Sequence, residues 1–338
     1  MKIAFFETEE WEEQRMKEFI KKNPVLKKQR ILFYKDKITP ETAILAKDYE
    51  IISTFIYSKI NKETLKELKN LKFIATRSTG FDHIDINECK KNRIVVSNVP
   101  SYGSVTVAEH TFALILAYSR KIIQSVERTK RGDFSIQGLR GFDLQGKTIG
   151  VIGTGRIGKE VIRIANGFGM KILAYDKFKD LNYAKNMNFK YVPLNKLLSS
   201  SDIITLHLPY NNETHHIINE KNIGKIKKGA LLVNTARGAL IETRALAKAL
   251  TNKILGGVCL DVLEEEAIIK EENELLTQDF TQKQLATALQ NLFLIAKDNV
   301  IITPHNAFNS EEAVNKIIET TFENIAGFIN KNPKNIVN

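Results

Sequence analysis

The chain contains very little cysteine. Cys89 and Cys259 are the only two in 338 residues, and neither belongs to a C-x-x-C pair or stands near other metal-ligating residues. Two isolated cysteines cannot build the disulfide framework that holds small secreted domains together. We therefore expect two reduced, buried thiols in a cytoplasmic protein.

Long apolar runs, targeting signals and zinc-protease motifs are also absent. No stretch of roughly 18 apolar residues occurs, so the sequence excludes a membrane-spanning helix. The N-terminus turns acidic at Glu7, Glu9 and Glu10, which is too early for a secretory signal peptide. Neither an H-E-x-x-H pattern nor a cluster of potential ligands is present, and we expect no bound metal.

The charge is basic, but no basic block exists. The formal net charge is +11, from 50 Lys and Arg against 39 Asp and Glu. Such an excess can indicate a nucleic-acid or anionic-membrane partner. Here the lysines are interspersed with glutamates, as in Lys62-Glu63 and Lys66-Glu67, which is typical of an ordinary solvated surface. We expect neither partner, although the excess can attract small acidic substrates.

What the sequence does contain is a regular alternation of β-rich and helical patterns. In the first hundred residues, runs rich in β-branched and aromatic residues predict strands at 3–6, 31–34, 51–55, 73–76 and 94–97. Helical patterns at 9–22, 62–69 and 85–91 separate some of these strands. The alternation predicts a parallel sheet covered by helices. A long helical pattern then extends from about Val105 to Arg131.

A second alternation begins at Lys147. It predicts strands at 148–152, 171–175, 203–206, 230–234, 257–262 and 300–303. The last helical pattern, from about Glu311 to Asn330, has no strand of its own, and we expect it to pack on the first domain. The chain is long enough for two domains with separate cores. It would cross between them near Pro100 and Pro304, which suggests a hinge around a cleft.

The residues Gly153-Thr-Gly-Arg-Ile-Gly158 directly follow a predicted strand and open a helical pattern. In such a turn the first glycine allows a tight bend, the second lets the backbone approach a pyrophosphate, and the third lets the helix pack closely. The helix N-terminus adds free N–H groups. Asp176 closes the next strand, where a carboxylate accepts hydrogen bonds from a ribose and repels a 2′-phosphate. The pattern predicts NAD; a glycine-rich turn without a cofactor is the alternative.

Polar residues follow the later strands. They are His207-Leu-Pro209 after 203–206, Thr235-Ala-Arg237 after 230–234, Asp261 with Glu264-Glu-Glu266 after Val258-Cys-Leu260, and His305 after 300–303. A doubly wound sheet binds its ligand beyond the carboxyl ends of its strands. We therefore expect these residues around the reactive end of the cofactor.

Three of these residues suit the reduction of a 2-keto acid by hydride transfer. An arginine such as Arg237 can hold a carboxylate and polarise a carbonyl, because its planar fork binds oxygens bidentately and keeps its proton. A histidine such as His305 can give a proton to the new alcohol oxygen. A carboxylate such as Glu266 orients a neighbouring imidazole and raises its pKa. Singly, they could be a solvated arginine, one of three surface glutamates and a packing histidine.

Together the motifs resemble the D-isomer-specific 2-hydroxyacid dehydrogenase family. The resemblance covers nearly the whole chain, with the motifs in family order. It rests on Arg77-Ser-Thr-Gly-Phe-Asp-His-Ile-Asp85, Val99-Pro-Ser-Tyr-Gly103, Val107-Ala-Glu-His110, Gly153–Gly158 with Asp176, Asn234-Thr-Ala-Arg-Gly238, Leu260-Asp-Val-Leu-Glu-Glu-Glu266 and Thr303-Pro-His305.

The resemblance implies an α/β architecture of two doubly wound parallel-sheet domains. A central Rossmann NAD-binding domain would span 102–305, and a discontinuous flavodoxin-like substrate domain would combine 1–101 with 306–338. The implied catalytic residues are Arg237, Glu266 and His305. The implied cofactor residues are Gly153, Gly155, Arg156, Ile157, Gly158, Asp176, Leu208, Pro209, Thr214, Thr235, Ala236 and Asp261. The implied substrate residues are Thr79, Gly80, Tyr102, Arg237 and Phe308, and the family usually forms homodimers.

The run His305-Asn-Ala-Phe308 is more similar to the lactate-type branch than to the phosphoglycerate or glyoxylate branches. The resemblance thus predicts an NAD-dependent enzyme that interconverts a small 2-keto acid and its D-2-hydroxy acid, with pyruvate and D-lactate as the first candidates. One alternative is a reductase of glyoxylate, hydroxypyruvate or a bulkier 2-keto acid. Another is an NAD(H)-sensing interaction protein similar to the corepressors that share this fold.

Two further features have less definite interpretations. The stretch 267–299 is longer than an ordinary connection, and Leu285, Ala288, Leu289, Leu292 and Phe293 recur in it at helical spacing. It could be a packed surface helix, a dimer contact or a cover over the site. Among the other histidines, we expect His215 and His216 in a surface turn, and His207 beside the cofactor without a chemical role.

Overall fold

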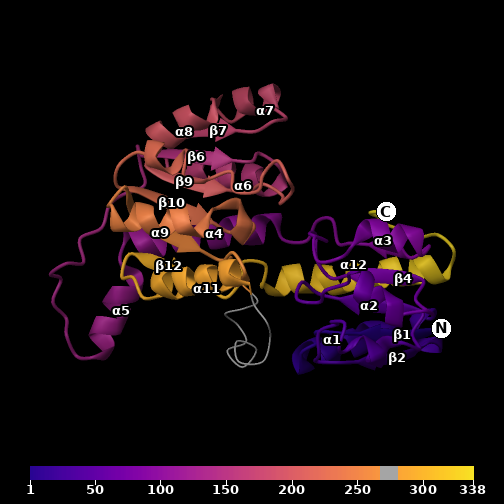
Figure 1. Cartoon of the computed structure of the whole chain (residues 1–338). Coiled ribbons are helices and arrows are strands. Elements are labelled where there is room, and N and C mark those ends of the chain that lie inside the picture. The colour runs from indigo at the N-terminus through magenta and orange to yellow at the C-terminus, as the bar shows by residue number, and fades with distance from the viewer. Residues whose placement is uncertain (267–280) are drawn as a thin grey trace. The chain divides into compact units, whose positions relative to one another are not determined.

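The computed structural model describes residues 1–266 and 281–338 (Figure 1). The chain folds into two compact units: unit 1 combines Met1–Tyr102 with Ser310–Asn338, and unit 2 spans Gly103–Asn309. The observed divisions after residues 102 and 309 lie slightly beyond the predicted ones after 101 and 305. Both units are built on parallel sheets, as the sequence predicts.

Unit 1 contains a five-stranded parallel sheet in the order β2-β1-β3-β4-β5. Its strands are β1 (Lys2–Phe5), β2 (Arg30–Phe33), β3 (Ile51–Thr54), β4 (Phe73–Thr76) and β5 (Val95–Ser97). All five were predicted, and each observed end lies within one residue of the predicted one. The inner strands β3 and β4 are buried along their whole length, which explains why they are apolar runs and not alternating patterns.

Helices cover both faces of this sheet. They are α1 (Glu10–Lys22), α2 (Lys62–Glu67), α3 (Ile86–Lys91) and α12 (Glu311–Ile329). The last helix returns from the far end of the chain to lie beside β4 (Figure 1). Its Phe322 and Phe328 rings lie 5.3 Å and 4.4 Å from the rings of Phe5 and Phe73. The prediction that this helix packs on the first domain is confirmed.

Unit 2 contains a seven-stranded parallel sheet in the order β12-β11-β10-β9-β6-β7-β8. Its strands are β6 (Thr148–Ile152), β7 (Lys171–Tyr175), β8 (Lys190–Tyr191), β9 (Ile203–Leu206), β10 (Ala230–Asn234), β11 (Leu255–Leu260) and β12 (Val300–Ile302). Only the two-residue edge strand β8 was missed, because it is too short to form a pattern. The chain adds strands outward from β6 and then reverses at β9, and ligands bind at such a switch point.

Two layers of helices enclose this second sheet. One face is covered by α4 (Ser104–Ser119), α6 (Arg156–Gly167) and α7 (Leu181–Asn186), and the other by α8 (Leu194–Ser200) and α9 (Thr243–Thr251). The residues of β6 alternate between the two cores, with Ile149 and Val151 in one and Ile152 in the other. Each strand is therefore buried on both sides, which is typical of a doubly wound sheet.

The long helix predicted from Val105 to Arg131 is in fact two helices. α4 ends at Ser119, and α5 (Ile122–Lys130) begins after Lys121, whose φ is +54°. The break is caused by a distant segment: Phe142 N–H donates to the Ser119 carbonyl at 3.0 Å, and the backbone of Gly141 lies directly against that oxygen. No proline or glycine marks the break, so the helical pattern continues through it.

The helical spacing in the 267–299 stretch corresponds to α11 (Gln282–Ile295), which begins with a capping box formed by Thr281 and Gln284. The predicted apolar stripe is largely exposed, however: Leu285, Leu289 and Leu292 are 40, 68 and 50% exposed. Of the predicted stripe only Ala288 is buried, and the buried face also carries Thr287, Asn291 and Leu294. The interpretation as a packed stripe is therefore wrong for most of those residues. Residues 267–280 lie outside the described part of the chain.

The expectation for the two cysteines is confirmed as far as burial and pairing go. Cys89 and Cys259 are both buried, and neither forms a disulfide. Burial raises the pKa of the Cys89 thiol to about 12. No helix among residues 1–266 and 281–338 combines the length and the apolar character that a bilayer crossing needs.

Candidate active site

The three glycines of the β6–α6 turn have three different structural roles. Gly153 has a φ of +97°, and a Cβ there would lie 2.6 Å from the His207 carbonyl oxygen. Gly155 is the N-cap of α6, and a Cβ added to it would meet no atom within 4 Å. Gly158 packs directly on the Gly153 carbonyl. The open space at Gly155, beside the free N–H groups of α6, fits a pyrophosphate.

Asp176 directly follows β7 and is fixed by this same turn. Its Oδ2 accepts hydrogen bonds from Thr154 N at 2.6 Å and Thr154 Oγ1 at 3.1 Å, and its Oδ1 accepts from Phe178 N at 2.8 Å. An ionised carboxylate has about four acceptor positions. Asp176 can therefore still accept a bond from a ribose hydroxyl while its orientation is held by the protein.

The other predicted cofactor residues lie on the loops that leave the same edge of the sheet. Arg156 and Ile157 open α6. Leu208, Pro209 and Thr214 belong to the loop after β9, which Thr214 Oγ1 folds by donating to the Pro209 carbonyl at 2.7 Å. Thr235 Oγ1 lies 2.9 Å from Thr111 Oγ1, and Ala236 N donates to Asn234 Oδ1 at 3.0 Å. These loops follow the carboxyl ends of adjacent strands, where the fold binds ligands.

His305 and Glu266 form an imidazole–carboxylate pair. His305 Nδ1 lies 3.2 Å from both Glu266 carboxylate oxygens, and the two side chains are 18% and 17% exposed. The pair occupies the edge of the sheet beyond β11 and β12. Because Nδ1 faces the carboxylate, Nε2 is the ring nitrogen with which His305 can serve a substrate.

Asp261 holds the backbone that carries His305. Its Oδ1 accepts from Thr303 Oγ1 at 2.5 Å and from Asn306 N at 3.0 Å, and its Oδ2 accepts from Ala307 N at 2.9 Å. Asp261 is only 1% exposed. His305 has a φ of +56°, a left-handed conformation that persists only when its surroundings impose it. The Asp261 carboxylate thus shapes the histidine loop, a role that sequence reasoning missed.

The three consecutive glutamates have three different partners. Glu266 pairs with His305, Glu265 accepts from Gln284 Nε2 at 3.5 Å, and Glu264 Oε1 lies 2.7 Å from His216 Nε2. His216 was expected in a surface turn, but its side chain is only 19% exposed and its ring is engaged. The turn is as expected and His215 is exposed, but the His216 side chain is largely buried, because Glu264, distant in sequence, is its partner.

Arg237 lies in the loop that follows β10. Asn234, 1% exposed, shapes this loop by donating from Nδ2 to the Arg237 carbonyl at 2.8 Å. The guanidinium donates from Nη1 to the Ala236 carbonyl at 2.8 Å. β10, β11 and β12 are parallel neighbours. The loops that carry Arg237, Glu266 and His305 therefore all lie at the carboxyl-end edge of the sheet of unit 2.

Thr79, Gly80 and Tyr102 belong to unit 1, whereas Phe308 belongs to unit 2. Thr79 and Gly80 lie in the loop after β4, which is tightly held. Asn98 Nδ2 donates to the Thr79 carbonyl at 2.8 Å, and Thr79 Oγ1 donates to the Val99 carbonyl at 2.7 Å. We infer that this loop has little freedom to change shape.

A buried hydrogen-bond chain extends from this loop to the C-terminal segment. Asn324 of α12, fully buried, donates to the Asn98 carbonyl at 2.9 Å, and Asn335 Nδ2 donates to Asn324 Oδ1 at 2.8 Å. Arg77, which precedes the loop, is 1% exposed and donates to the carbonyls of Phe6 and Glu7. Sequence reasoning missed Asn98 and Asn324; the only signal was an asparagine within an otherwise apolar helical face.

Among the described residues, no group of three or more His, Cys, Asp or Glu side chains could hold a metal ion. The edge of unit 2 carries an arginine, an imidazole–carboxylate pair and a dinucleotide turn. Together with the doubly wound sheet, they define a dinucleotide-dependent dehydrogenase.

Comparisons with known proteins agree with this class. The family model for the NAD-binding domain of D-isomer-specific 2-hydroxyacid dehydrogenases matches residues 112–307. D-lactate dehydrogenase of Escherichia coli is 36% identical over 299 residues, covering 87% of this chain and 88% of that protein. A D-specific alpha-keto acid dehydrogenase of Enterococcus faecium is 41% identical over 82% of this chain and 83% of its own. The crystal structure of D-lactate dehydrogenase from Aquifex aeolicus complexed with NAD and lactic acid has a TM-score of 0.86 at 37% identity, covering 98% of this chain and 96% of that one.

The chain belongs to the D-isomer-specific 2-hydroxyacid dehydrogenase family, and within it to the D-lactate dehydrogenase-like branch. The resemblance drawn from the sequence, the fold class and the prediction of an enzyme are thereby confirmed. NAD is the cofactor, and the glycine turn and Asp176 fit it.

Proposed function

We propose that the protein reduces pyruvate to D-lactate, reversibly, with Arg237, His305 and Glu266 as its catalytic residues. The observation that carries the proposal is the His305–Glu266 pair, with Nδ1 3.2 Å from both carboxylate oxygens at the edge where the Arg237 loop also emerges. Relatives of the D-lactate dehydrogenase type support the substrate, and one of their structures contains NAD and lactic acid.

Each residue has a distinct task in this reaction. Bound NADH supplies the hydride that the carbonyl carbon receives. Arg237 binds the substrate carboxylate and withdraws electrons from the carbonyl, since its guanidinium stays charged. His305 gives its Nε2 proton to the carbonyl oxygen as that oxygen gains charge, and recovers a proton from solvent afterwards. Glu266 keeps the ring oriented, because both its carboxylate oxygens lie 3.2 Å from Nδ1.

We also assign substrate contacts to Thr79, Gly80, Tyr102 and Phe308. The N–H groups of the loop at Thr79 and Gly80 suit a carboxylate, because this loop is held by Asn98 and Val99 and need not be ordered when substrate binds. The aromatic side chains at Tyr102 and Phe308 would limit the size of the substrate side chain. This assignment is consistent with a small 2-keto acid.

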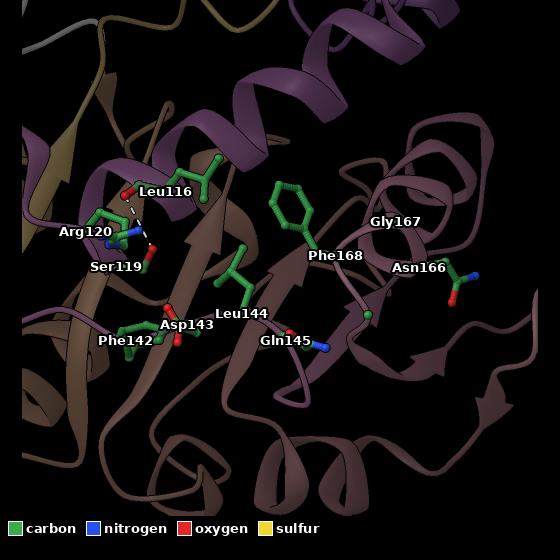
Figure 2. Close-up of a pocket in the computed structure, with 11 residues that line it drawn as sticks. Leu116, Ser119, Arg120, Phe142, Asp143, Leu144, Gln145, Asn166, Gly167 and Phe168 are labelled. Atoms are coloured by element: carbon green, nitrogen blue, oxygen red, sulfur yellow. Dashed lines mark hydrogen bonds between the residues drawn. The ribbon is translucent and has the colours of Figure 1, made fainter.

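We propose that the protein is a homodimer in the cytoplasm. Unit 2 exposes apolar side chains on α5 and in the loop that follows it, with Phe134 and Ile136 79% and 86% exposed. A pocket of about 540 Å³ lies at the opposite end of the sheet from the cofactor turn, and Leu116, Leu144 and Phe168 converge in it (Figure 2). A second copy could cover both features.

The cytoplasmic assignment is supported by two thiols that form no disulfide.

The experiment that tests the substrate is NADH oxidation with pyruvate, glyoxylate, hydroxypyruvate and longer 2-keto acids. We expect the highest kcat/KM with pyruvate. A preference for glyoxylate, hydroxypyruvate or a branched acid would replace the substrate but keep the class. Negligible turnover with every acid, together with tight NADH binding, would favour the interaction-protein alternative instead.

Sedimentation of the wild type and of Phe134→Ser tests the dimer, and a wild-type monomer would contradict it.

A further inference from the structure

A second imidazole–carboxylate pair lies beside the proposed catalytic one. His216 Nε2 is 2.7 Å from Glu264 Oε1, and the two side chains are 19% and 11% exposed. The other oxygen of Glu264 accepts from Thr243 N at 3.2 Å and from Thr243 Oγ1 at 2.8 Å. Burial raises the pKa of Glu264, but the hydrogen bonds from His216 and Thr243 outweigh it and hold the pKa below its ordinary value. Glu264 is thus a charged, fully engaged carboxylate.

His216 contacts the Arg237 loop through its backbone and the Glu266 loop through its ring. Its N–H donates to the carbonyl of Ala239, two residues after Arg237, at 2.9 Å. Its own carbonyl accepts from Asn219 Nδ2 at 2.7 Å. The residue has a φ of +50°, an unfavourable conformation for a histidine that must be imposed by these contacts. One residue therefore ties together two loops that are distant in sequence.

The same two loops also pack backbone against backbone. A side chain at Gly238 would overlap the carbonyl group of Leu263 and the amide of Glu264. Asn291 of α11 also holds this segment: it is fully buried and donates from Nδ2 to the Glu264 carbonyl at 2.8 Å. Glu264 is thus held by His216, by Thr243 and by Asn291, in the segment that carries Glu266 and that packs against Gly238 of the Arg237 loop.

We propose that His216 and Glu264 are positioning residues that clamp the Arg237 loop to the Glu266 loop. The proposal rests on the proposed function, in which Arg237 and Glu266 act on one substrate and on its proton donor. Neither His216 nor Glu264 touches the reacting atoms. Their contribution is to keep a guanidinium and a carboxylate at a fixed separation, and reactions that depend on orientation lose rate steeply when such a separation changes.

Three substitutions of His216 distinguish a positioning role from a role in stability alone. His216→Gln keeps a donor near the Nε2 position and should retain the bond to Glu264. His216→Asn is shorter and cannot reach Glu264, yet asparagine tolerates a positive φ better than most residues. His216→Ala removes the donor altogether. The matched control is His215→Ala, because His215 stacks on the His216 ring and, among the described residues, its other side-chain contact is with the Tyr210 ring and Oη, the latter at 3.4 Å.

We expect His216→Ala and His216→Asn to lower kcat/KM for pyruvate by about 10- to 100-fold, with NADH affinity close to that of the wild type and a lower Tm, because the buried Glu264 carboxylate loses one of its partners. His216→Gln should recover most of the activity, and His215→Ala should behave as the wild type. Wild-type activity in His216→Ala would overturn the clamp. The clamp would also be overturned if the Ala, Asn and Gln variants of His216 all lost NADH affinity and Tm to the same extent. That pattern would indicate a purely structural residue.

A failure of the clamp can be told apart from a failure of the proposed function. If the wild type reduces no 2-keto acid, the proposed function is wrong, and the clamp is then judged on crystal structures of the wild type and His216→Ala. A displacement of about 1 Å or more between the Arg237 and Glu266 loops would support it. An unchanged separation would overturn it, whatever the substrate of the enzyme.

Discussion

Alanine at Gly153 should lower the stability of the fold, whereas alanine at Gly155 should lower the affinity for NADH, although the two residues belong to one turn. At Gly153 the φ of +97° is unfavourable for alanine, and the new Cβ would lie 2.6 Å and 2.7 Å from the His207 carbonyl oxygen and carbon. The backbone penalty is about 1–3 kcal/mol, and forcing a methyl group into packed backbone adds about 1–3 kcal/mol. Gly153→Ala should therefore lower the free energy of unfolding by about 2–6 kcal/mol.

Gly155→Ala should leave stability unchanged or slightly improved. The φ of this residue is −67°, and nothing lies within 4 Å of the new Cβ, so the substitution mainly reduces the freedom of the unfolded chain, by about 0.4–1 kcal/mol. The methyl group would instead occupy the space that a pyrophosphate needs. We expect a loss of NADH affinity of at least about tenfold, since about 1.4 kcal/mol corresponds to that factor.

Urea unfolding followed by fluorescence measures the first effect, and titration of the protein with NADH measures the second. If Gly155→Ala kept wild-type NADH affinity, the cofactor would not approach the N-terminus of α6, and the assignment of the crevice would be refuted. If Gly153→Ala were as stable as Gly155→Ala, the close approach of the His207 backbone would not constrain the turn.

Three further predictions concern single side chains. Asp176→Ala should raise activity with NADPH relative to NADH, because the carboxylate that repels a 2′-phosphate is gone; an unaltered ratio of kcat/KM values would contradict the ribose contact. His305→Ala should reduce kcat by about 10²–10⁴-fold while NADH affinity changes little, and stopped-flow hydride transfer at the wild-type rate would exclude His305 as the proton donor. The third concerns His207: burial lowers the pKa of His207 to about 3 from 6.5, so the unfolded chain binds a proton in this range that the folded chain does not. Stability should therefore fall as the pH drops from about 6.5 toward 3, and less so in His207→Asn; parallel curves of unfolding free energy against pH would contradict it.

The fold was predictable because both units obey simple rules. Buried parallel strands appear as apolar runs, and eleven such runs can be located by composition and by the turn residues that separate them. Local patterns fail where a distant segment decides the outcome. The helix that ends at Ser119 stops because the backbone of Gly141 and Phe142 reaches its last turn, and nothing near Ser119 in the sequence signals that contact.

The same distinction applies to the site. Arg237, Asp176 and His305 could be singled out because each directly follows a predicted strand, and strand ends define the ligand edge of this fold. The glutamates at 264, 265 and 266 could not be told apart by position alone, since only their partners separate them. His216, Asn98 and Asn324 depend on hydrogen bonds across 48, 19 and 226 positions of sequence. Spacing within a motif cannot reveal bonds of that kind.

The return of α12 to the first unit has a consequence for synthesis on the ribosome. Phe5 and Phe73 are translated before unit 2, but the rings that cover them, Phe322 and Phe328, are translated after it. Unit 2 lies between them in the sequence and can complete its sheet as soon as β12 has emerged. The sheet of unit 1 must therefore wait, without the cover that α12 gives it, until α12 has left the exit tunnel, and nascent chains stalled before that point should attract chaperones.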